Sequence, residues 1–176
     1  MNGEDQADLT LEFNHHKSID KSETWRKYLS PNRITLRDAQ AFSAEFVGTF
    51  FLALTIATTK VSTAPGGAPF AIGMVLVGLV YTTAPISGGQ LNPAVTIGLV
   101  VRRKLQLFEA LYCIVSQIAG AFVAGGVSYA LYNYNWDNVG YPAVADDDRR
   151  PQAFVAELLQ TFCLVMVVLN TGTTKV

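Results

Sequence analysis

The chain has 176 residues, is 50% hydrophobic and carries a formal net charge of −1 at pH 7. Charge is unevenly spread, because residues 1–40 hold 13 of the 27 charged side chains and residues 61–101 hold none. The near-neutral net charge says nothing about partners. The uncharged run of 41 residues is too long for a single membrane span and fits a span followed by a re-entrant segment.

Residues 1–38 predict a polar N-terminal tail on the cytoplasmic side of a membrane. The predicted inner segments hold ten Lys and Arg residues and the outer segments hold three, as the positive-inside rule requires. Within the tail the basic residues are Lys17, Lys21, Arg26, Lys27, Arg33 and Arg37. Thr35-Leu36-Arg37-Asp38 has the form of a capping box and predicts that a helix begins there.

Four apolar segments predict membrane-spanning helices, at about residues 39–59, 68–86, 107–132 and 153–169. Glu45 lies inside the first span, where a carboxylate is costly and is expected to face the bundle interior with a partner. The alternative is an interfacial glutamate that reaches water. Pro85 is expected to end the second span. An aromatic belt follows the third span, formed by Tyr129, Tyr132, Tyr134 and Trp136.

The segment 87–101 predicts a different element. It starts as a glycine loop and becomes helical at Asn92, a good N-cap followed by a proline preset for the first turn. A helix over 92–101 would be about 15 Å long, about half of a ~30 Å hydrocarbon core. The basic residues 102–104 suit its C-terminus and a membrane interface. This pattern indicates a re-entrant half-helix whose N-terminus is buried at mid-membrane, inside protein or beside a water-filled cavity.

An internal repeat connects the first and fourth spans. Residues 41–52 and 153–164 are offset by 112 positions and share seven of twelve residues, including Glu45 and Glu157. The two copies begin on opposite sides of the membrane, because three spans separate them. Such an inverted repeat is a common plan of transport proteins with a site near the midplane.

Three segments now carry a family resemblance. Ala-Glu-Phe-Val-Gly-Thr-Phe at 44–50, Ser-Gly-Gly-Gln-Leu-Asn-Pro-Ala-Val-Thr at 87–96 and Ser-Gln-Ile-Ala-Gly-Ala at 116–121 resemble the major intrinsic protein family, the aquaporins and glycerol facilitators. The resemblance covers about residues 41–176. It implies an all-α membrane protein with an inverted repeat of six tilted helices and two half-helices, whose Asn-Pro-Ala ends meet at the centre, usually in a tetramer. Residues 39–176 would supply four helices and one half-helix of this channel domain.

The resemblance also implies the pore residues. Asn92, with Pro93 and Ala94, matches the first Asn-Pro-Ala motif, and its side-chain amide would face the lumen while its oxygen caps the half-helix. Backbone carbonyls at 88–90 would form an acceptor ladder for water. The remaining pore positions are apolar: Leu52 and Leu164 would face the asparagines, and Ile72 would belong to the outer selectivity filter.

Polar side chains are expected to support the loops. We predict that Glu157 accepts hydrogen bonds from the N–H groups of residues 88–91 or from the Gln90 side chain, because a buried carboxylate needs such partners. Glu45 would bind a second loop that residues 1–176 do not contain, and it would therefore have fewer hydrogen-bond partners than Glu157. Gln117 is a third supporting residue. Cys113 and Cys163 lie in apolar runs and are expected to be buried hydrophobes rather than metal ligands.

The sequence departs from the family pattern in three ways. Gln90 stands where many members have His, although an amide can bond to the same carboxylate. Ile72 replaces the aromatic residue or His of strict water channels, which favours a wider, less polar filter. The repeat offset would place the second asparagine near position 204, beyond Val176, so the channel domain is expected to be truncated.

These patterns predict a passive channel for water, with small neutral solutes as further substrates. A glycerol facilitator is the alternative within the class. A non-conducting truncated subunit that associates with full-length channels is the alternative from another class. No paired-acid, Ser/His/Asp or metal-ligand constellation favours an enzyme, and no cofactor or nucleic acid is implied. Expected partners are membrane lipids and related channels in a homo- or hetero-tetramer, in a membrane that the sequence leaves undefined.

Overall fold

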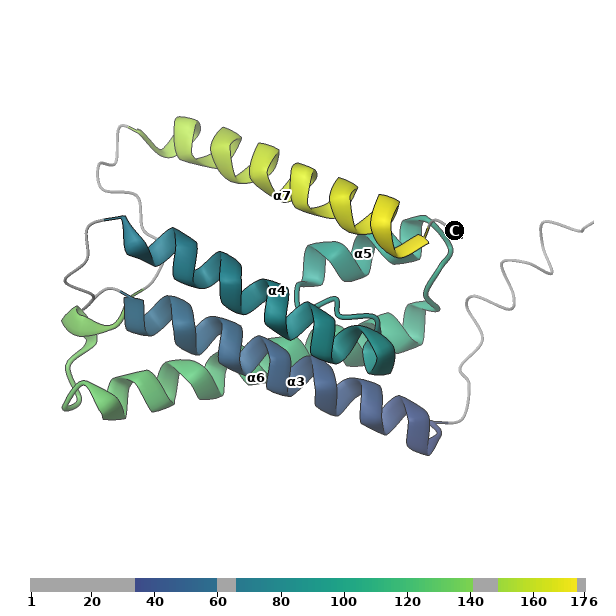
Figure 1. Cartoon of the computed structure of the whole chain (residues 1–176), viewed down its shortest axis with the longest axis horizontal. Coiled ribbons are helices and arrows are strands. Elements are labelled where there is room, and N and C mark those ends of the chain that lie inside the picture. Colours follow the sequence, from purple (N-terminus) through teal and green to yellow (C-terminus); the bar gives the residue numbers. More distant parts are fainter. Residues whose placement is uncertain (1–33, 60–65, 141–148, 174–176) are drawn as a thin grey trace, which may run out of the picture.

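The computed structural model describes residues 34–59, 66–140 and 149–173, and these ranges contain helices and loops but no strand (Figure 1). Four helices within these ranges are long and apolar enough to cross a membrane. These long helices are α3 Leu36–Thr58, α4 Gly67–Ser87, α6 Leu107–Leu131 and α7 Arg150–Thr173, and the shorter elements are α5 Pro93–Val101 and the 3-10 turn η2 Trp136–Asn138. The predicted all-helical architecture is confirmed, and it makes the chain a multi-pass membrane protein.

Local sequence signals set the helix ends. The predicted capping box is present at the start of α3, where Thr35 N donates to Asp38 Oδ2 at 2.7 Å and Asp38 N donates to Thr35 Oγ1 at 3.3 Å. The prediction that Pro85 ends the second span is wrong, because α4 continues to Ser87. A proline this close to a helix end removes a single backbone donor, and its fixed φ is itself helical.

The helix α3 lies at the centre of the described packing, against α4 on one side and α6 on the other, while α5 contacts α6 and α7 (Figure 1). The backbones of α3 and α6 approach closely at Gly120, where an added Cβ would lie 2.4 Å from the carbonyl oxygen of Phe46. A small residue permits this kind of tight helix contact. Gly98 plays the same part between α5 and α7, where a Cβ would lie 2.8 Å from Val165 Cγ1.

The connection after α6 is fastened to the C-terminal end of α3. Gly140 N donates to the carbonyl oxygen of Ala57 at 2.8 Å, and the Tyr132 hydroxyl donates to that of Thr58 at 3.1 Å. Tyr129 stacks on Trp136 with ring centroids 4.4 Å apart and meets Tyr134 edge-on at 5.3 Å. Three residues of the predicted aromatic belt, Tyr129, Tyr134 and Trp136, therefore pack on one another at this end of the bundle.

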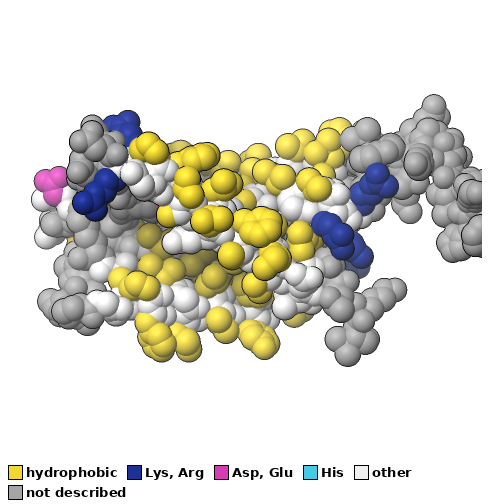
Figure 2. All heavy atoms as spheres, turned by 90° about the horizontal axis from the view of Figure 1, so that it is seen from above, with side chains coloured by type: hydrophobic (Ala, Val, Ile, Leu, Met, Phe, Trp, Pro, Cys, Tyr) yellow, Lys and Arg dark blue, Asp and Glu magenta, His cyan; other side chains and the backbone are white. Residues whose placement is uncertain are grey.

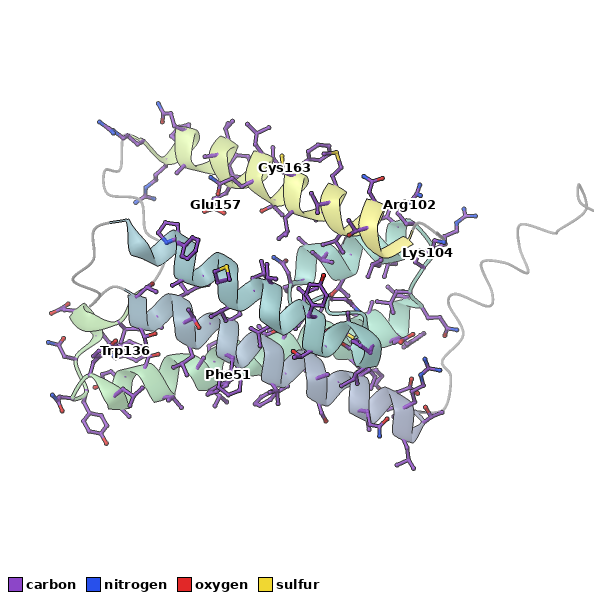
Figure 3. All side chains as sticks on the ribbon, viewed as in Figure 1. Phe51, Arg102, Lys104, Trp136, Glu157 and Cys163 are labelled. Atoms are coloured by element: carbon purple, nitrogen blue, oxygen red, sulfur yellow. The ribbon has the colours of Figure 1, made fainter. Side chains whose placement is uncertain are left out.

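The surface of the described residues is apolar along the length of the helices. Figure 2 shows hydrophobic side chains over the middle of one face and Lys and Arg side chains toward its two ends. Cys113 is buried, but Cys163 is exposed on α7 (Figure 3), so the prediction of two buried cysteines is wrong for the second. The reason is that no part of the membrane-spanning window of α7 is buried within the described chain.

Candidate functional site

The half-helix α5 begins as its sequence predicts. Asn92 is the N-cap, and its side-chain Oδ1 accepts a hydrogen bond from the backbone N–H of Ala94 at 2.8 Å. Pro93 occupies the first helical position, where its missing N–H costs nothing. Since the oxygen of the Asn92 amide is engaged at the cap, its two N–H donors are left to bond elsewhere.

The loop that leads into α5 is folded tightly. Gly88 and Gly89 have φ values of 90° and 62°, and Leu91 has a φ of 49°. An added Cβ on Gly89 would lie 3.2 Å from the carbonyl oxygen of Val80, so the loop presses against the backbone of α4. Glycine is needed at this position both for the left-handed conformation and for the close approach.

Glu45 organises this loop from α3. Its side chain is 0% exposed. One carboxylate oxygen accepts bonds from the Ser87 hydroxyl at 2.5 Å and from Gln90 N at 3.0 Å. The other accepts bonds from Leu91 N at 2.7 Å and Gln117 Nε2 at 2.8 Å. A carboxylate taken out of water needs such donors, so these bonds offset its desolvation and hold the loop against α3.

The acceptor for this loop was expected to be Glu157, and that prediction is wrong. Glu157 lies on α7, where it is exposed (Figure 3). Glu45, expected to have fewer hydrogen-bond partners than Glu157, is fully buried with four donors. The Gln90 side chain also differs from expectation, because its Nε2 donates to the Ser87 carbonyl oxygen at 3.1 Å rather than to a carboxylate. The backbone N–H of Gln90, not its side chain, reaches the glutamate.

Gln117 extends the polar network from the carboxylate to the half-helix. Its Nε2 donates to Glu45 and also to the Thr96 hydroxyl at 3.1 Å, and that hydroxyl donates to the carbonyl oxygen of Asn92 at 3.1 Å. Ser87 and Thr96 were not among the residues predicted to support this loop. Ser87 opens the glycine motif, and Thr96 lies four residues after Asn92, where a threonine hydroxyl can bond back to the i−4 carbonyl.

Three successive carbonyl groups of the loop are left without a donor. Within the described residues no hydrogen bond ends on the backbone oxygens of Gly88, Gly89 or Gln90. The loop amides at 90 and 91 are bound to Glu45 instead. The loop therefore supplies three consecutive backbone acceptors just before Asn92 in the chain, and the Asn92 amide keeps two N–H donors.

The apolar positions proposed for the pore lie on three different helices. Leu52 on α3, Ile72 on α4 and Leu164 on α7 are each partly buried. Ala94 and Pro93 lie in the first turn of α5 and are also partly buried. The assignment of Leu52, Ile72 and Leu164 to a pore lining rests on the family resemblance.

Comparison with known proteins is consistent with this geometry. The family model for the major intrinsic protein matches residues 35–175. The chain belongs to this family. It is 36% identical over 171 residues to Aquaporin PIP1-6 of Zea mays, covering 85% of this chain and 58% of that protein. It is 41% identical over 144 residues to Aquaporin PIP1-2 of Musa acuminata, covering 75% of this chain and 56% of the relative.

A third aquaporin, PIP1-1 of Arabidopsis thaliana, is 39% identical over 144 residues, which are 75% of this chain and 50% of that protein. The chain thus spans about half the length of the curated relatives it matches. The aquaporins of the major intrinsic protein family are channels rather than enzymes. The matched region includes every element described above, from the capping box of α3 to the end of α7.

Proposed function

We propose that the chain forms one side of a passive membrane channel for water, lined by the loop 88–91 and the N-terminus of α5. The observation that carries the proposal is that three consecutive carbonyl groups precede Asn92 without a donor, in a loop that the buried Glu45 carboxylate holds. Water is both a donor and an acceptor. A path with acceptors along the loop and donors at Asn92 would replace the bonds that water gives up on entering.

The half-helix also supports rejection of cations and protons. Asn92 lies at the N-terminus of α5, which carries roughly +0.5 of an elementary charge from the helix dipole. Positive helix ends in a narrow pore raise the energy of cations there. A neutral molecule such as water does not meet this barrier, so the proposed selectivity needs no ionised side chain in the lumen.

Small neutral solutes such as glycerol are a second candidate substrate. Ile72 is the feature that favours them, because it has no hydrogen-bond donor and is smaller than an aromatic ring. At the outer filter it would leave a wider and less polar opening. We propose that the completed channel passes water and is more permissive for glycerol than a filter with an aromatic residue at this position.

Association with further protein is proposed because two helices expose their spans. In the described chain 6% of the membrane-spanning window of α4 and 0% of that of α7 is buried. Glu157 is exposed within α7, and a carboxylate facing lipid is costly. We therefore propose that α7 meets a second half-helix unit, in one chain or from a related channel in a homo- or hetero-tetramer. A regulatory subunit without conduction is the other role these faces support.

The orientation and surroundings are proposed from the same features. Three basic residues at the end of α5 and the basic tail favour a cytoplasmic N-terminus by the positive-inside rule. Lipids would cover the remaining apolar faces.

Fusing residues 1–176 to the second half of the Zea mays relative tests the channel proposal. Osmotic shrinkage of liposomes containing the fusion should be clearly faster than that of empty liposomes. The Asn92→Asp variant should lose most of this permeability, because a carboxylate cannot donate. A fusion that folds but conducts no water would refute the channel proposal. If residues 1–176 instead altered the permeability of the full-length relative, the regulatory role would be supported.

A further inference from the structure

The half-helix ends in a basic turn formed by Arg102, Arg103 and Lys104, which are all exposed. Arg103 N donates to the carbonyl oxygen of Val100 at 2.8 Å, and Lys104 N donates to that of Leu99 at 2.8 Å. These two bonds are the Schellman arrangement, which ends many helices on a residue in the left-handed conformation.

The left-handed residue of this turn is Arg103, with a φ of 57°. Glycine is the usual residue there, because a Cβ makes the conformation unfavourable. Among the described residues, glycine occupies three positive-φ positions, and Leu91, Arg103, Asn133 and Tyr134 are the non-glycine residues with a positive φ. Non-glycine residues in this conformation cluster at functional sites, which makes the Arg103 side chain a candidate for a role.

The surroundings of the basic turn place it at a membrane surface. Val101 before it is 75% exposed, and Leu107 and Phe108 after it are each 37% exposed. Arg102 and Lys104 lie together where α5 ends (Figure 3). Apolar side chains that flank a cluster of cations fit the boundary between hydrocarbon and headgroups. The acidic residue of the next helical turn, Glu109, is partly buried.

We propose that the basic turn binds the phosphate headgroups of anionic phospholipids. The planar guanidinium groups of Arg102 and Arg103 match phosphate oxygens in pairs, and the Lys104 ammonium adds a point charge. A basic side chain near an anionic leaflet contributes about fivefold to binding. The positive-inside rule needs only positive charge in this loop, whereas paired contacts to phosphate need the guanidinium groups of Arg102 and Arg103.

Native mass spectrometry of the 176-residue chain in mixed micelles tests this proposal. The micelles would contain equal amounts of phosphatidylglycerol and phosphatidylcholine, and the readout is the ratio of the two lipids retained on the protein. The variants are Arg103→Gly and a triple variant with Arg102→Gln, Arg103→Gly and Lys104→Gln. Arg149→Gln is the matched control, because it removes an exposed cation near the start of α7.

The chain should retain phosphatidylglycerol in clear excess. Arg103→Gly should lower the retained ratio about fivefold and the triple variant up to about a hundredfold, while Arg149→Gln leaves it unchanged. The thermal midpoint of Arg103→Gly should not fall, since glycine suits the left-handed position, and this separates lipid binding from folding. An unchanged ratio in the triple variant, or an equal loss in Arg149→Gln, would overturn the proposal. Displacement of the lipid by millimolar inorganic phosphate would also overturn the proposal, because the basic turn would then be a site for free phosphate.

Discussion

Replacing Glu45 by glutamine tests how the loop before α5 is held. The substitution keeps the size and shape of the side chain but removes its charge and one acceptor oxygen. Each oxygen of Glu45 now accepts two hydrogen bonds, from Ser87 and Gln90 on one side and from Leu91 and Gln117 on the other. A glutamine amide can serve only one of these two pairs as an acceptor.

The less costly orientation places the amide nitrogen opposite Ser87 and Gln90. The Ser87 hydroxyl can then accept a bond and donate to the carbonyl oxygen of Thr83, which is already 3.3 Å away. The Gln90 N–H is the donor left without an acceptor. One buried unsatisfied donor together with the lost charge costs about 2–3 kcal/mol, which is about a 30- to 160-fold increase in local opening of the loop.

Hydrogen exchange measured by mass spectrometry on a peptide containing Gln90 and Leu91 reports this opening directly. Exchange of these two amides should accelerate by the factor above in Glu45→Gln. Glu157→Gln is the matched control, because it makes the same change at the equivalent repeat position, where the side chain is exposed. Its effect should stay within about 0.5 kcal/mol. Equal acceleration in both variants, or no acceleration in Glu45→Gln, would refute the assignment of Glu45 as the loop's acceptor.

Three further substitutions have separate expected outcomes. Gly120→Ala would place a Cβ 2.4 Å from the Phe46 carbonyl oxygen and should destabilise the chain by about 1–3 kcal/mol in thermal unfolding, whereas Gly126→Ala, with open space around it, should not destabilise it. Asn92→Ala removes the cap of α5 and should cost about 1 kcal/mol in the same measurement, so no loss of stability would count against the cap. In the fused channel, Ile72→Phe should reduce glycerol entry into liposomes more than water entry, and equal loss of both fluxes would place Ile72 away from the filter.

Much of the fold follows from local signals in the sequence. The capping box at Thr35 and the Asn-Pro start of α5 fixed two helix starts, because side-chain caps and a preset proline act within a few residues. The long apolar runs located the four spans. The end of α4 was not predicted correctly from Pro85, because the effect of a proline depends on how close it lies to the helix end.

To predict which glutamate binds the loop before α5, one must compare how far each residue lies along its helix from the same side of the membrane. Glu45 lies nine residues after the start of α3, and Asn92 lies nine residues before the end of α5, a rise of about 13 Å in both cases. Glu157 lies sixteen residues before the end of α7, a rise of about 24 Å. The repeat identifies the two glutamates as equivalent but does not say which loop each one meets.

The partners of buried polar side chains were harder to predict. Gln90 could bond to a carboxylate by its chemistry, yet its side chain turns to the Ser87 carbonyl while its backbone N–H meets Glu45. Which of these bonds forms depends on the left-handed residues 88, 89 and 91, whose combined geometry no local pattern specifies.

The central claim is that the α5 half-helix lines a water pore together with a second half-helix. The most direct test compares the water permeability of residues 1–176 alone with that of the same residues reconstituted with a separately expressed second half of the Zea mays relative. Half a pore wall leaves Asn92 opposite lipid or another chain, so osmotic shrinkage by stopped-flow light scattering should match empty liposomes for the chain alone and exceed them for the pair. If the chain alone conducted water and lost this permeability in Asn92→Asp, the claim that α5 needs a second half-helix would be contradicted. If the pair folded well but conducted no water, the claim that α5 lines a water pore would be contradicted.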